Sequence, residues 1–151
     1  MSFQKILCTT DFSERSYAAV DAAADLARTC SAELHLLHVV SPLPSIASHI
    51  PPSGFNMSLY QEEMEKHAWG MMKKTAAERI PEGITVKTHV VQGEPARHIV
   101  QFARENGVSL IVISSQGHGG WSLGFGSVAE KVVRHSPVPV LLVPVEKAPE
   151  H

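Results

Sequence analysis

The chain has 151 residues, of which 44% are hydrophobic and 19% charged, and its formal net charge is −2. This composition is too apolar for a disordered chain, and it lacks the basic excess with which proteins bind a nucleic-acid backbone. The N-terminus has no signal-peptide pattern, and no apolar run approaches the ~20 residues that cross a bilayer. We therefore expect one cytoplasmic domain over residues 1–151 that binds neither nucleic acid nor a membrane.

Short apolar runs typical of strands alternate with stretches of helical periodicity. The predicted strands are Ile6–Thr10, Leu34–Val40, Ile84–Val91, Leu110–Ile113 and Val138–Val143. Because parallel neighbours need a helical crossover, this alternation predicts a parallel sheet covered by helices.

Four helices are expected between these strands. The first has Ser13 as its N-cap and extends to Cys30. The second begins at Ser58–Gln61, which has the spacing of a capping box. Its predicted buried face consists of Met64, Ala68, Met71, Met72 and Thr75.

The third helix opens with Pro95 and ends at Asn106–Gly107. The fourth opens with a second capping box, Ser127–Glu130, and is closed by Pro137. Residues 41–56 contain four prolines and are expected to form a mobile loop.

The strand composition predicts which strands lie at the edges of the sheet. Polar Thr85, Lys87 and His89 alternate with apolar residues, and Pro139 cannot donate to a central ladder. Edges at the third and fifth strands fit the order 3-2-1-4-5. The predicted fold is thus α/β, a five-stranded parallel sheet with two helices on each face, as in Rossmann-like proteins.

In an open α/β sheet, ligands bind beyond the carboxyl ends of the strands where the strand order reverses. Here that point lies between the ends of the first and fourth strands, at Thr9–Ser13 and Ser114–Ser127. The second segment has five glycines and leads into a helix N-terminus, which favours a phosphate-binding cradle. The alternative is a flexible turn that only Ser127 caps.

No other group of residues in the sequence predicts a chemical site as strongly as this glycine-rich segment does. Cys8 and Cys30 form no metal or redox motif and are expected to be buried thiols. His35 and His38 are three apart on a strand and face opposite ways. Ser115 and His118 share a loop that lacks a nucleophile elbow.

Several segments, in order along the chain, carry a family resemblance. They include Lys5–Leu7, Thr10–Glu14, Gly93–Pro95, Gly126–Val132 and Ser136–Leu141. From residue 5 to residue 143 the chain resembles the single-domain bacterial universal stress proteins. That resemblance implies a dimer and a fold whose members divide into ATP binders and non-binders.

The glycine loop resembles that of the binders, with two departures. The binders have Gly-x-x-Gly, nine residues, and then Gly-Ser or Gly-Thr, and here Gly117 and the pair Gly126–Ser127 match. Ser114 replaces the first glycine, and eight residues separate Gly117 from Gly126. A side chain at residue 114 takes up space that glycine leaves open.

The resemblance also implies individual roles at this site. Asp11 would accept hydrogen bonds from the nucleoside, and the backbone of Val39 would meet the adenine edge. Amides for the phosphates would come from Gly117, Gly126, Ser127 and Val128. Thr9 and Thr10 would border the ligand at the end of the first strand, where binders often have proline at the position of Thr9. Alternatively, Asp11 orients a turn, Val39 is core and Ser127 is an N-cap.

The function expected from the sequence is a regulatory stress-response module. It would hold ATP, with or without Mg²⁺, as a homodimer joined through Val138–Val143, and would act on an unknown protein partner. No carboxylate or lysine is placed to orient a water at the phosphates, so hydrolysis should be slow at most. The alternatives are a dimeric scaffold that binds no nucleotide and a small hydrolase.

Overall fold

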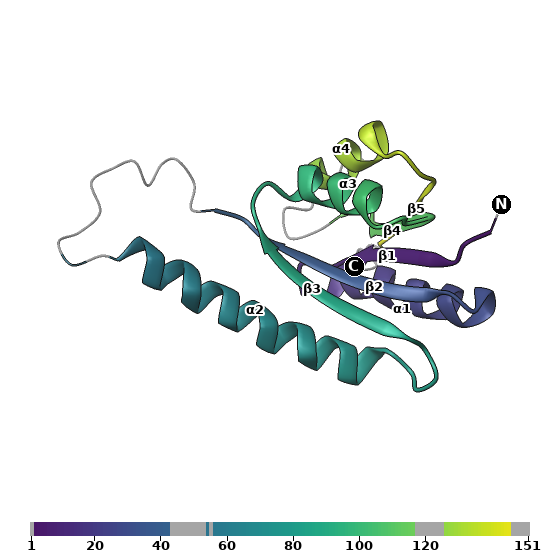
Figure 1. Ribbon diagram of the computed structural model, residues 1–151, viewed down its shortest axis with the longest axis horizontal. Coiled ribbons are helices and arrows are strands. Elements are labelled where there is room, and N and C mark those ends of the chain that lie inside the picture. The colour runs from purple at the N-terminus through teal and green to yellow at the C-terminus, as the bar shows by residue number, and fades with distance from the viewer. Residues whose placement is uncertain (1, 43–53, 55, 117–125, 146–151) are drawn as a thin grey trace, which may run out of the picture.

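The computed structural model describes residues 2–42, 54, 56–116 and 126–145, and within them strands and helices alternate (Figure 1). The strands are β1 (Lys5–Thr9), β2 (Glu33–Val40), β3 (Val86–Gln92), β4 (Leu110–Ser114) and β5 (Val140–Val143). The helices are α1 (Glu14–Cys30), α2 (Met57–Arg79), α3 (Pro95–Glu105) and α4 (Ser127–His135). All strand pairs are parallel and the sheet order is β3-β2-β1-β4-β5, which confirms the predicted topology.

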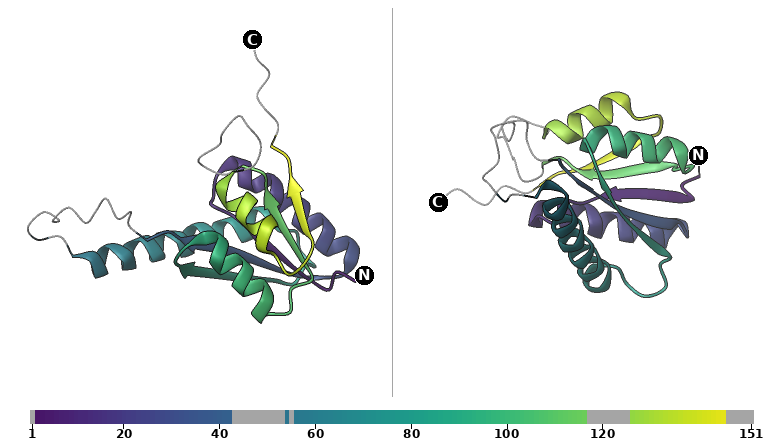
Figure 2. Two further views of the ribbon diagram at one scale, coloured as in Figure 1. Left: turned by 90° about the horizontal axis from the view of Figure 1, so that it is seen from above. Right: turned by 60° about the vertical axis from the view of Figure 1, so that its left-hand side comes forward.

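Two helices cover each face of this sheet (Figure 2). On one face α1 and α2 bury small side chains such as Ala23 and Ala68 against β1 and β2. On the other face α3 and α4 bury Ile99 and Val132 against β4. The interior strand β4 is buried along its whole length, as a strand covered on both faces should be.

Two helix N-termini differ from the sequence prediction. Ser13 caps α1 as expected, because its side chain accepts from Ser16 N. The cap of α2 is Asn56, whose side chain accepts from Leu59 N, and not Ser58. The cap of α4 is Gly126, and Ser127 is the first helical residue, so the predicted capping box at Ser127 is wrong.

Other expectations are also corrected. β3 begins at Val86 rather than Ile84, and β5 begins at Val140 rather than Val138. Cys30 is exposed, because it is the last residue of α1, whereas burial of Cys8 raises the pKa of its thiol. Met64 is exposed on the N-terminal part of α2, although Ala68, Met72 and Thr75 are buried as predicted. Most of the expected loop 41–56 lies outside the described residues.

Within the described ranges, no helix is both long and apolar enough to cross a membrane.

A histidine pair joins β2 to the edge strand β3 beneath α3. The Nδ1 atom of buried His35 lies 2.9 Å from His89 Nε2, and His35 Nε2 lies 2.5 Å from a Glu33 carboxylate oxygen. Lys87 Nζ lies 3.6 Å from the same carboxylate, and Phe102 of α3 packs against both imidazoles. His35 faces this cluster and His38 contacts Phe12 instead, so the two histidines do face opposite ways.

This cluster predicts that acid destabilises the fold. Burial, together with the positive charges of His35 and Lys87, lowers the pKa of His89. The hydrogen bond from His35 lowers the pKa of Glu33. A pKa lower in the folded than in the unfolded state gives stability above the unfolded value that is lost as the pH falls. We expect the melting temperature to fall below about pH 7, where His89 gains a proton in the unfolded chain, and to fall further below about pH 5, where Glu33 does so.

The matched variant for this prediction is His89→Gln. Its amide can donate to His35 Nδ1 but does not titrate. Thermal melts at several pH values should therefore show a smaller acid-induced fall in this variant. Equal pH dependence in both proteins would show that another group is responsible.

Candidate functional site

The turn between β1 and α1 is held by buried hydroxyl groups. Thr10 Oγ1 lies 2.8 Å from Ser16 Oγ and accepts from Phe12 N at 3.0 Å. Thr10 N in turn donates to Leu37 O at 3.0 Å. Thr10 therefore fixes the end of β1 to both β2 and α1, while Thr9 is the last, half-buried residue of the strand.

The turn then passes through a left-handed residue. Phe12 has φ +65°, a backbone conformation that residues other than Gly, Asn and Asp rarely adopt. This conformation costs on the order of 1 kcal/mol. Its ring lies 4.4 Å from that of His38, measured between centroids. His38 Nδ1 donates to Thr10 O at 2.8 Å. His38 thus contacts both the Phe12 ring and the backbone of this turn.

Asp11 lies in this turn with one oxygen committed to it. Its Oδ1 accepts from Ser13 N at 3.0 Å and from the Ser13 hydroxyl. The turn-orienting role weighed for Asp11 is therefore present in the structure. A nucleoside contact from the same carboxylate stays a prediction.

The end of β4 is joined to the start of α4. Ser115 N donates to Val143 O at 3.0 Å, and Ser115 O accepts from Gly126 N at 2.6 Å. The Ser114 hydroxyl donates to Gln116 O at 2.7 Å and accepts from Gln116 N at 3.3 Å. The N–H of Gly126 thus donates within the fold, and its expected role as a phosphate donor stays a prediction.

The three amides that follow Gly126 come before the first main-chain hydrogen bond of α4. Glu130 N donates to Gly126 O at 3.0 Å and makes the first main-chain bond of α4. The N–H groups of Ser127, Val128 and Ala129 therefore precede the helical hydrogen-bond pattern, as the first-turn donors of a helix do. Together with the positive end of the helix dipole, these donors suit an anion.

Val39 brings a third element to the same edge of the sheet. Leu37 O accepts from Thr10 N, so the peptide groups of Leu37 face β1. Backbone groups repeat with a period of two, and those of Val39 therefore face the same side, beyond the last pair of β1 and β2 at Leu37. The side chain of Val39 packs into the core, so both roles weighed for this residue are compatible.

The described residues thus bring together Thr9, Thr10, Asp11, Val39, Ser114, Ser127 and Val128 at one edge. Gly117 lies outside the described residues. Among those described, no group of three metal-ligating side chains could hold a metal ion. The sequence did not predict the contacts of His38 with Thr10 O or of Ser115 with Val143 and Gly126, because they depend on the pairing of separate strands.

The model of the universal stress protein family matches residues 2–144. This chain belongs to that family. Universal stress protein YxiE of Bacillus subtilis is 34% identical to it over 146 residues, which cover 93% of this chain and 99% of YxiE.

Solved structures of the family share the fold. The structure of MJ0577 from Methanocaldococcus jannaschii has 28% identity and a TM-score of 0.84, with 98% of this chain and all of that chain covered. A universal stress protein in complex with cAMP has 24% identity and a TM-score of 0.62, with 97% of this chain and 100% of that chain covered. Its likeness to this chain is one of fold.

Proposed function

We propose that this universal stress protein binds ATP or a related adenine nucleotide at the edge between β1 and β4. One observation carries the proposal, namely that three sets of groups suited to the three parts of a nucleotide meet there. Val39 offers peptide groups for a base, Asp11 a carboxylate for a ribose, and Ser127 and Val128 amides for phosphates. A protein of the same fold holds cAMP.

With a nucleotide bound, the protein would act as a regulatory module rather than as an enzyme. Phosphoryl transfer needs a group that positions the nucleophile and charges that neutralise the transition state. In the described part of this edge, Asp11 Oδ1 accepts from Ser13 N, and we assign this carboxylate to the ribose rather than to a water at the phosphates. Hydrolysis would therefore be slow, and the module would act in the cytoplasm on a protein partner.

The second candidate is a scaffold that binds no nucleotide. The internal bonds of Gly126 N and the Ser114 hydroxyl favour it, because both groups would otherwise face the ligand. Substitutions at Ser114 separate the candidates. Removing its Cβ should help an adenine nucleotide to approach the β4 end, since the buried serine occupies space that glycine leaves open.

We expect Ser114→Gly to tighten ATP binding a few-fold in isothermal titration calorimetry. The matched variant Ser114→Ala keeps Cβ and removes only the hydroxyl, so its affinity should stay close to that of the wild type. If both variants bind more weakly, the hydroxyl supports binding through its bonds to Gln116. Absence of ATP binding in all three proteins would favour the scaffold.

We also propose a homodimer in which the β5 strands lie antiparallel. In the described residues β5 pairs with β4, and its other edge carries no strand. An open edge invites pairing with another chain, and a two-fold axis covers both copies at once. Val140 and Leu142 pack into the core, whereas Leu141 is 40% exposed.

Leu141→Lys should shift the protein from dimer to monomer in light scattering, because the charge would lie in the interface. The matched control is Leu59→Lys on α2, which replaces another exposed leucine and should leave the dimer intact. An unchanged mass for Leu141→Lys would place the interface elsewhere.

A further inference from the structure

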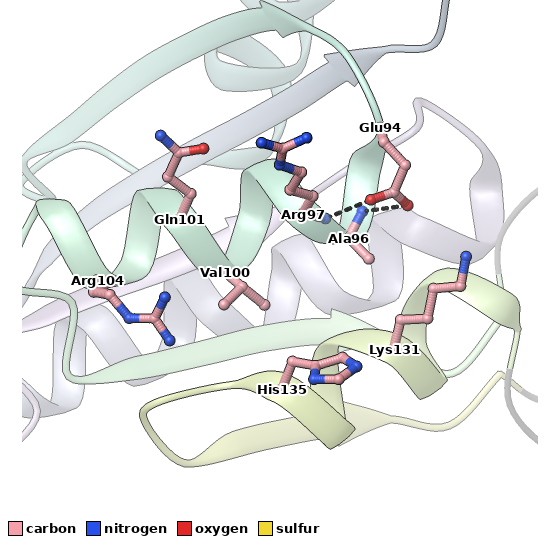
Figure 3. Close-up of a pocket in the computed structure, with 8 residues that line it drawn as sticks. All are labelled: Glu94, Ala96, Arg97, Val100, Gln101, Arg104, Lys131 and His135. Carbon is pink, nitrogen blue, oxygen red and sulfur yellow. Dashed lines mark hydrogen bonds between the residues drawn. The ribbon is translucent and has the colours of Figure 1, made fainter.

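A groove between α3 and α4 has the form of a second ligand site, separate from the β1–β4 edge. Its volume is about 440 Å³, and small-molecule pockets typically have ~300–1,000 Å³. In Figure 3, Ala96 and Val100 point from α3 toward α4 and form an apolar floor.

Cationic side chains lie at both ends of this floor. Arg104 lies at one end in Figure 3, Lys131 extends from α4 at the other end, near Ala96, and His135 of α4 lies between them. Ala96 and Arg104 are eight residues apart, about 12 Å along the helix axis. The groove is therefore elongated, with positive charge at its ends and apolar surface between them.

These charges are not neutralised within the described part of the chain. Its ion pairs include neither Arg104 nor Lys131. The carboxylate of Glu94 also lines the groove, but it accepts from Ala96 N at 3.3 Å and Arg97 N at 2.8 Å. Glu94 thus caps α3 instead of pairing with Lys131, and it leaves that ammonium group available to an anion.

We propose that the groove binds a linear organic dianion. Its apolar chain would lie on Ala96 and Val100, one carboxylate or phosphoryl group would contact Arg104, and the other would contact Lys131. The guanidinium fork of Arg104 suits either kind of anionic group. This site does not depend on nucleotide binding at the β1–β4 edge.

Suberate, a long straight dicarboxylate, is a suitable probe in calorimetry with the full chain. Arg104→Gln and Lys131→Gln should each weaken its binding by up to about fivefold, the upper range for one exposed charge contact. Arg134→Gln is the matched control, because Arg134 lies on α4 outside the groove and pairs with Glu130. Octanoate, which has one carboxylate, should bind more weakly than suberate.

Amide chemical shifts of Val100 and Lys131 should move when suberate is added, also in Asp11→Ala, which removes a group of the nucleotide site. The proposal is wrong if suberate does not bind or if octanoate binds as well as suberate. It is also wrong if the wild type, Arg104→Gln, Lys131→Gln and Arg134→Gln all bind suberate equally. Binding of a glutamate-rich peptide without binding of suberate would also overturn it, since the groove would then serve a protein partner.

Discussion

Asp11→Ala is expected to weaken ATP binding by about 10- to 100-fold, since a hydrogen bond that involves a charged group contributes ~1.5–3 kcal/mol. The carboxylate lies in the turn that ends β1, where one oxygen accepts from Ser13 N. Calorimetry with ATP on the variant and the wild type measures the effect.

Two further variants separate a ligand contact from the role of Asp11 in the turn. Asp11→Asn keeps an oxygen that can accept from Ser13 N but loses the charge, so it should also bind ATP weakly while melting like the wild type. Asp25→Ala removes an exposed carboxylate from α1 and should leave binding unchanged. Equal ATP affinities for Asp11→Ala and the wild type would leave Asp11 with its turn role alone.

Thr10→Val should destabilise the fold by about 2–4 kcal/mol, because two partners lose the hydroxyl at once. Thr10 is 5% exposed, and its hydroxyl serves both Ser16 Oγ and Phe12 N. Valine has nearly the same shape, so the loss comes from hydrogen bonding rather than packing. Urea unfolding of both proteins gives the difference in the free energy of unfolding.

Thr9→Val is the matched control for this change. Thr9 is only half-buried, and its side chain makes no hydrogen bond to the described residues. Its free energy of unfolding should differ little from that of the wild type. Similar losses for the two threonines would show that the valine side chain, and not the hydroxyl network, causes the effect.

The sheet order could be predicted from the sequence because edge strands differ in composition from central ones. Prolines flank the strand Val140–Val143, and polar residues alternate along Val86–Gln92, whereas Leu110–Ile113 is apolar on both faces. These differences follow from burial and hydrogen bonding, which leave a pattern in the chain.

Helix starts were less predictable because several residues near each start can cap. Asn56 and Ser58 are both suitable, and only the structure shows that Asn56 accepts from Leu59 N. At α4, the bond from Gly126 N to Ser115 O ties Gly126 to the end of β4, so the helix begins one residue later than a capping box at Ser127 requires. A tertiary contact of this kind leaves no local pattern.

The location of the candidate site, but not its detailed contacts, could be predicted from the sequence. The topology brings the ends of β1 and β4 together, and the sequence contains enough to predict that topology. The hydrogen bond from His38 to Thr10 O depends on strand register, and so does the histidine pair of β2 and β3. Register could not be read from one sequence, so these contacts were missed.

An amide-resolved NMR titration with ATP tests the central proposal most directly. We predict that the signals of Asp11, Val39, Ser127 and Val128 shift together with one dissociation constant, while Val100 in the α3–α4 groove stays unchanged. No shift at millimolar ATP, or shifts confined to residues away from the β1–β4 edge, would contradict the account.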